Sequence, residues 1–73
     1  MVIEEENYLK KFGSNVERIK KEKKLAYRKI AANCGLEHGD IKRYVDGKVN
    51  LTLLSLVDLA KGLDVHPKDL LDF

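Results

Sequence analysis

The chain has 73 residues, of which 36% are charged and 44% are hydrophobic, and its net charge is +2. A chain of this length buries only about 60% of its unfolded surface, which leaves no room for an active site assembled from several loops. Its hydrophobic content is ordinary for a globular protein and argues against intrinsic disorder. We therefore expect a single domain over residues 1–73, with residues 1–5 frayed.

Cys34 is the only cysteine, so no disulfide can form within the chain, which fits a reducing compartment. The acidic N-terminal stretch lacks the layout of a signal peptide, and no apolar run approaches the roughly 20 residues of a membrane span. The sequence therefore predicts a cytoplasmic protein without a membrane segment. Because no second thiol is present, we interpret Cys34 as a buried structural thiol rather than a redox switch or a metal ligand.

Positive charge is concentrated in residues 17–30. This stretch contains seven basic and two acidic residues, so its local net charge is +5. Such a block favours a polyanionic partner. A solvated helix face would give the same pattern, so the position of the block relative to the other elements decides its meaning.

A first helix is predicted over residues 6–23, because four apolar side chains recur every three or four residues. These are Leu9, Phe12, Val16 and Ile19. The stretch Gly13-Ser14-Asn15 contains poor helix formers, so a start at Ser14 is the alternative. We favour the longer helix, since Leu9 and Phe12 stay in phase with Val16.

Two short helices are expected next, from residue 26 or 27 to residue 33 and from residue 37 or 38 to residue 46. Gly35 lies between them and can adopt a positive φ, which allows the chain to reverse direction sharply. The second of these helices has an apolar face formed by Ile41, Tyr44 and Val45. Two helices joined by such a turn form a helix-turn-helix, whose second helix can enter the major groove of DNA.

The remaining residues predict two more helices and no strand. Thr52 is a suitable N-cap for a fourth helix, whose apolar face comprises Leu53, Leu56, Val57, Leu59, Ala60 and Leu63. His66, near the N-cap, and Pro67, at the first helical position, are typical of the start of a short fifth helix. The C-terminal Leu70, Leu71 and Phe73 either fold back onto the first and fourth helices or meet a second subunit. The fold class expected is all-α, with five short helices.

The stretch from Phe12 to Leu71 resembles the lambda-repressor-like helix-turn-helix family, of the Cro and phage-repressor (XRE) type. The resemblance rests on FGSNVERIKKEKKL, KIAANCGLEHGDIKRYVDGK and NLTLLSLVDLAKGLDVHPKDLL. It is best at turn and packing positions, namely Ala31, Gly35, Leu36, Ile41, Gly47, Leu53, Leu56, Leu59, Ala60, Leu63 and Val65. The resemblance implies a homodimer that binds double-stranded DNA.

The resemblance also implies which residues touch DNA. Positions that face bases in the family correspond here to His38, Gly39, Lys42 and Arg43, and positions that hold phosphates correspond to Tyr27, Arg28, Lys48 and Asn50. An arginine can donate two parallel hydrogen bonds to a guanine edge. Lysine, asparagine and tyrosine side chains can bond phosphate oxygens and set the register.

Four residues depart from the family pattern. Tyr27 stands where the family often has Gln, Glu37 stands where Ser or Thr is usual, and Asp40 adds a second acid to the recognition helix. These three weaken or alter the contact with DNA. The fourth departure is Val45, which replaces an acid that in many members pairs with a base on the first helix, here Lys20.

The sequence contains no nucleophile–base set, glycine-rich phosphate loop or metal-ligand spacing, so we expect no enzyme, cofactor, metal or small-molecule ligand. We predict a small transcriptional regulator that binds specific duplex DNA and represses by occupying a promoter. An antitoxin or a restriction-system controller would have the same sequence features. The alternative function is a protein-interaction module that kept the fold and lost base readout, which the acids on the third helix suggest.

Overall fold

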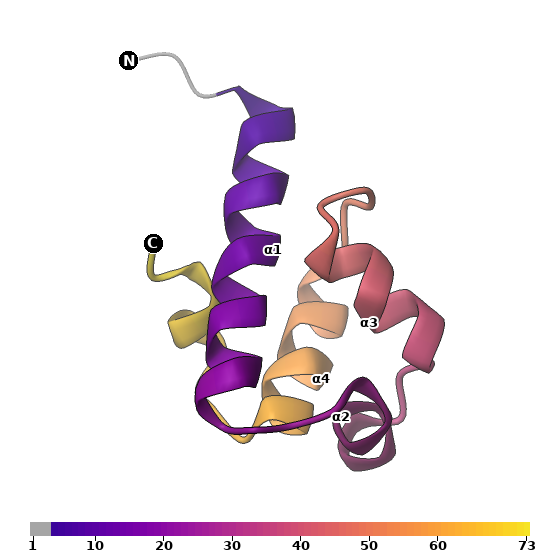
Figure 1. Cartoon of the computed structure of the whole chain (residues 1–73). Helices are drawn as coiled ribbons and strands as arrows, with labels where there is room; N and C mark the ends of the chain where they lie inside the picture. The colour runs from indigo at the N-terminus through magenta and orange to yellow at the C-terminus, as the bar shows by residue number, and fades with distance from the viewer. Residues whose placement is uncertain (1–3) are drawn as a thin grey trace.

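The computed structural model describes residues 4–73, apart from the side chain of Glu6, and this part of the chain consists of helices joined by short loops, with no strand (Figure 1). The elements are α1 (Glu5–Glu22), α2 (Tyr27–Cys34), α3 (His38–Val45), α4 (Leu53–Leu63) and a 3-10 helix, η1 (Pro67–Leu71). The predicted all-α class is confirmed, and the fifth helix proves to be of the 3-10 type. None of these helices is both long and apolar enough to cross a membrane.

The prediction that residues 1–5 are frayed is wrong at Glu5. This residue is helical and begins α1. Residues 1–3 of that segment lie outside the described residues. The Tyr8 amide donates to the Glu4 carbonyl, and the Tyr8 ring packs 5.1 Å from the ring of Phe73. These contacts support the first turn of α1.

Gly13 does not interrupt α1, which excludes the alternative start at Ser14. A Cβ atom at Gly13 would lie only 2.0 Å from the carbonyl oxygen of Val45. The glycine therefore allows the end of α3 to approach the backbone of α1 closely, and its weak helix propensity is offset by this packing.

The turn between α2 and α3 has the geometry that its sequence predicts. Gly35 caps α2 with φ of 76°, and its amide donates to the Ala31 carbonyl at 3.0 Å. In this left-handed conformation a glycine carries no steric penalty. The chain can then leave α2 and begin α3 within three residues, which sets the two helices at the angle seen in Figure 1.

The core contains side chains from all five elements. Its buried members are Phe12, Val16, Ile19, Ile30, Ile41, Leu56, Leu59, Ala60, Leu63 and Leu70. Tyr44 packs against this core, as predicted. The expectation that Leu53 belongs to the buried face of α4 is wrong, because Leu53 is 74% exposed. Leu53 is the first residue of α4, and the core begins one turn further along the helix.

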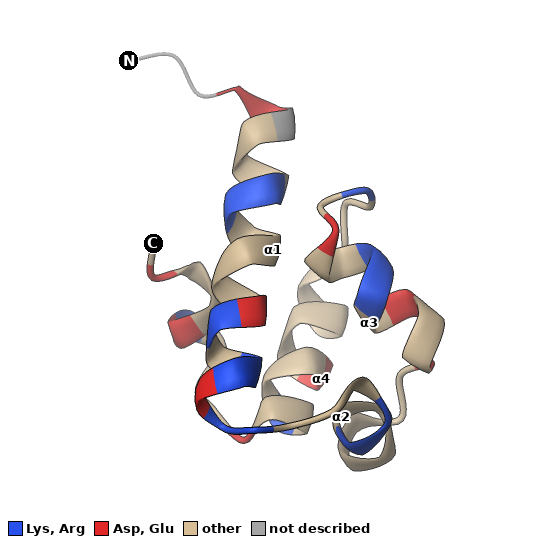
Figure 2. Ribbon diagram, viewed as in Figure 1, with Lys and Arg blue, Asp and Glu red and all other residues tan. Residues whose placement is uncertain are grey.

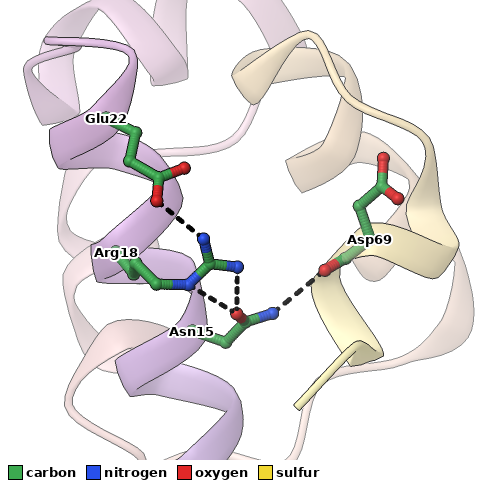
Figure 3. A network of polar contacts seen from close by, with 4 residues as sticks. All are labelled: Asn15, Arg18, Glu22 and Asp69. Carbon is green, nitrogen blue, oxygen red and sulfur yellow. Dashed lines mark hydrogen bonds and ion pairs between the residues drawn. The ribbon is translucent and has the colours of Figure 1, made fainter.

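A buried asparagine fastens the C-terminal segment to α1 (Figure 3). The Asn15 amide donates to the carbonyls of Asp69 and Leu70 at 3.0 Å each, and its oxygen accepts from Arg18 at 2.8 Å. Arg18 also pairs with Glu22 at 2.8 Å. Carbonyl groups at the end of a short helix have few helical partners. The Asp69 carbonyl also accepts from the Asp72 amide at 3.5 Å, so Asn15 adds a shorter bond to this group and a buried bond to the Leu70 carbonyl.

Both predicted N-caps are confirmed. The Thr52 hydroxyl accepts from the Ser55 amide at 3.1 Å. His66 accepts from the Lys68 amide through Nδ1, and its own amide donates to the Asp69 carboxylate, each at 3.2 Å. This reciprocal arrangement fixes the start of η1.

Candidate nucleic-acid interface

Helix α3 separates its apolar side chains from the residues predicted to face bases. Ile41 is fully buried, whereas the four predicted residues are all exposed. These are His38, Gly39, Lys42 and Arg43. Eight residues of α-helix span about 12 Å, so these positions form a row short enough to lie within one stretch of major groove.

The residues predicted to hold phosphates lie on both sides of this row. Arg28 is exposed in the first turn of α2, and Lys48 and Asn50 are exposed in the loop that follows α3. The rings of Tyr27 and His38 lie 5.7 Å apart in an edge-on arrangement, so the start of α2 adjoins the start of α3. Figure 2 shows basic residues on α2, on α3 and in the loop after α3.

Tyr27 differs from the other predicted residues because it is half-buried and its hydroxyl already has a partner. The hydroxyl donates to the Glu17 carboxylate at 2.9 Å. Burial, this hydrogen bond and the negative charges of Glu17 and Asp46 raise the pKa of Tyr27 to about 12. A hydroxyl has one proton to donate, so a bond from Tyr27 to a phosphate oxygen requires the bond to Glu17 to break.

Lys20 contacts Glu17 and Tyr27 instead of the acid that many family members have at the position of Val45. Its Nζ atom lies 3.8 Å from the Glu17 carboxylate and 4.8 Å from the centroid of the Tyr27 ring. The Lys20–Glu17 pair could have been inferred from its spacing of three residues on one helix. The contact of both residues with Tyr27 could not, because it depends on how α1 packs against α2.

The two acids at the start of α3 have different surroundings. Asp40 forms an ion pair with Arg43 on the same helix, so this acid does not stand alone on the outward side of α3. Glu37 occupies the N-cap position, where its side chain makes no capping hydrogen bond. The acidic residues that depart from the family pattern therefore cannot be treated as one group.

Cys34 and the histidine and carboxylate side chains are the other residues that could bind a metal ion or react. Cys34 is half-buried rather than buried as predicted, and its thiol lies 3.9 Å from the Ala31 carbonyl oxygen. Over residues 4–73, no group of three or more His, Cys, Asp or Glu side chains is placed to hold a metal ion.

Comparisons with known proteins bear on the family and the fold of the chain. No model of a protein family matches the chain. A curated relative, the control protein C.BamHI of Bacillus amyloliquefaciens, is 36% identical over 63 residues, which cover 85% of this chain and 78% of the relative. The crystal structure of the restriction-modification controller protein C.AhdI from Aeromonas hydrophila superposes with a TM-score of 0.80 at 29% identity, covering 85% of this chain and 94% of that one.

The helix-turn-helix and the exposed row on α3 define a lambda-repressor-like DNA-binding transcriptional regulator, as predicted from the sequence. Within this class, the chain belongs to the family of restriction-modification control proteins. The predicted family and the predicted class of function are thus confirmed.

Proposed function

We propose that the protein controls the transcription of restriction-modification genes by binding, as a homodimer in the cytoplasm, to an inverted repeat at their promoter. It acts by binding, without catalysis or a cofactor, and represses by occupying the promoter. The observation that carries the proposal is the exposed row on α3, a helix that buries Ile41 in the core. A dimer would place one α3 in each of two half-sites about one helical turn of DNA apart.

Each predicted residue has a role in this complex. Arg43 reads a guanine edge, and the exposed residues His38, Gly39 and Lys42 face the neighbouring bases. Arg28, Lys48 and Asn50 bond phosphates and fix the position of α3 in the groove. Tyr27 contacts His38 from the side and either supports it or exchanges its bond to Glu17 for one to phosphate.

Helix α2 offers a further group for a phosphate beside Arg28. Its N-cap residue, Ala26, provides no side-chain hydrogen bond. The first amide groups of an α-helix have no partner within the helix, and the positive end of the helix dipole favours an anion. Because Arg28 is exposed in this first turn, a phosphate placed there would meet both a charge and backbone donors.

An apolar surface formed by α1, the start of α4 and the C-terminal segment supports the homodimer. We call Tyr8, Leu53, Leu71 and Phe73 the apolar end face; they are between 42% and 74% exposed. The first three line an open hollow of about 250 Å³, and the Tyr8 and Phe73 rings are in contact. A small protein rarely exposes a connected apolar surface of this kind unless a partner covers it. In a symmetric dimer the same surface of each copy meets the other.

Binding to random-sequence duplexes, followed by selection and sequencing at two salt concentrations, tests the proposal directly. Enrichment of an inverted repeat, with affinity that falls as salt rises, is the expected result. Weak, salt-sensitive binding without enrichment would indicate that only the basic block of residues 17–30 contacts DNA. An absence of binding would favour the protein-interaction module instead.

Two substitutions separate base reading from phosphate binding. Arg43→Ala is expected to relax specificity at one base pair, by about 1–3 kcal/mol. Lys48→Ala is expected to weaken binding to all sequences alike. It should also make the slope of log affinity against log salt concentration less steep by about one, which corresponds to one phosphate contact. If neither substitution alters the affinity for DNA, the assignment of α3 as the recognition helix is wrong.

A further inference from the structure

Asp40 is an acid on the recognition helix, which would be expected to repel DNA. Its carboxylate forms an ion pair with the guanidinium of Arg43, three residues further along α3. The Arg43 side chain is 58% exposed, and the Asp40 side chain is 33% exposed. Arg43 therefore reaches the surface while a neighbour on its own helix already holds its guanidinium.

We infer that Asp40 is a positioning and specificity-determining residue, which holds Arg43 toward base edges and so sets how well the protein distinguishes its operator from other DNA. The inference rests on the proposed function of α3 as the recognition helix. It goes beyond that proposal because it assigns a role in discrimination to a residue that need not touch DNA.

The two kinds of DNA contact make different demands on Arg43. An unrestrained arginine can turn toward a phosphate, and this contact strengthens binding to DNA of any sequence. The pair with Asp40 opposes rotation of the Arg43 side chain away from α3 toward the DNA backbone. A guanidinium has five N–H donors in a fixed plane, so Arg43 can direct two of them at guanine while another remains bonded to Asp40. Asp40 therefore opposes non-specific binding more strongly than specific binding.

A second exposed residue on α3 is held in a comparable way. The ring of His38 meets the ring of Tyr27, whose hydroxyl donates to Glu17 at 2.9 Å. An acid thus restrains each of these two side chains, directly for Arg43 and through Tyr27 for His38. Restraint of a side chain before binding reduces the conformational entropy that is lost in the complex.

Glu37 provides a matched control for the charge of Asp40. It is exposed at the N-cap of α3, and among the described residues no ion pair involves it. Glu37→Gln and Asp40→Asn each remove one negative charge from the same end of the same helix. Only the second substitution removes the partner of Arg43.

The experiment compares the affinity for the selected operator with the affinity for a scrambled duplex of equal length, for the full-length chain and its variants. Asp40→Asn is expected to raise the affinity for scrambled DNA and to lower the ratio of the two affinities about 5- to 10-fold, within the roughly 5- to 150-fold that one bidentate base contact provides. Glu37→Gln is expected to raise both affinities and leave their ratio unchanged. Asp40→Glu, which keeps a carboxylate within reach of Arg43, is expected to retain most of the ratio.

The same measurement in an Arg43→Ala background tests whether Asp40 acts through Arg43. There, Asp40→Asn is expected to change the ratio no further. The inference is overturned if Asp40→Asn leaves the ratio intact, if Glu37→Gln lowers it equally, or if the effect persists without Arg43. A wild-type protein with no preferred sequence would overturn the proposed function as well, whereas a specific wild type with an unaffected Asp40→Asn variant overturns the inference alone.

Discussion

The outward face of α3 and the apolar end face are both exposed, but their side chains are held differently. On α3, Arg43 is paired with Asp40 and His38 contacts Tyr27, so these groups are arranged before any partner arrives. On the apolar end face, Leu53 is 74% exposed and the adjacent Leu54 is 76% exposed. Apolar surface in water is unfavourable until something covers it.

We propose that this difference suits the two faces to two kinds of partner. A polar face with its own internal ion pair stays stable in water and can exchange its contacts for those of DNA. An apolar face gains most by meeting an equivalent surface, as a second copy would provide. The comparison therefore predicts that substitutions on the end face change assembly, whereas substitutions on α3 change DNA recognition.

The largest effect is expected from Leu53→Glu, which places a charge within the apolar end face. The loss of a residue at the centre of an interface costs about 2 kcal/mol or more of binding free energy. The dimer dissociation constant should therefore rise about 30-fold or more. Sedimentation at several protein concentrations measures the change. Ser14→Glu, on the exposed side of α1, adds the same charge and should leave the dimer intact. A dimer that survives Leu53→Glu would exclude this face as the interface.

Asn15→Ala should disturb the end face without a direct change to α3. It removes the donor for two carbonyls of η1 and the acceptor for Arg18, so we expect the free energy of unfolding to fall by about 2–3 kcal/mol. Urea denaturation measures this change. Asn33→Ala is the matched control, because Asn33 is exposed and, among the described residues, its side chain makes a single hydrogen bond, to the Gly62 carbonyl at 3.5 Å. Equal losses in the two variants would contradict the role given to Asn15.

Tyr27 should be the source of a pH dependence at the edge of the α3 face. Its pKa is about 12 in the folded protein against 10.0 for an unperturbed tyrosine. A raised pKa means that the folded state retains the proton longer than the unfolded state. The corresponding stability is thus complete below pH 10 and is lost as the pH rises from 10 to about 12.

Absorbance titration of the tyrosines checks this expectation. One of the three tyrosines should ionise near pH 12, and that late transition should be missing from Tyr27→Phe. Glu17→Gln should move it toward pH 10, since the amide removes the negative charge that disfavours the phenolate. A late transition that persists in Tyr27→Phe would assign the high pKa to another residue.

The smallest effect is expected at Gly39, within the exposed row. A Cβ atom there would have no neighbour within 4 Å, so Gly39→Ala should stabilise the free protein by up to about 1 kcal/mol. The same methyl group should weaken DNA binding if the backbone of α3 lies close to the base edges. Thermal unfolding with and without operator DNA separates the two effects. Gly13→Ala is the opposite case, because its Cβ would meet the Val45 carbonyl and the fold should be destabilised.

The row on α3 could be predicted from the sequence because it depends on local features. Periodic apolar residues place Ile41 inward, and Gly35 fixes where α3 begins, so the opposite side of the helix must face solvent. The partners of these residues were harder to predict. The Asp40–Arg43 pair has the spacing of neighbours on one helix, but Glu17 and Tyr27 come together only when α1 packs against α2.

The sequence alone determined the all-α class, the approximate positions of the four α-helices, the turn at Gly35, the caps at Thr52 and His66 and the family resemblance. Each of these depends on the order of residues within a few turns of helix. The tertiary structure decided that Asn15 bonds to Asp69 and Leu70, which lie 54 and 55 positions further along the chain, and that Leu53 is exposed. These outcomes depend on where one helix ends against another, and periodicity within a single helix contains no information about that geometry.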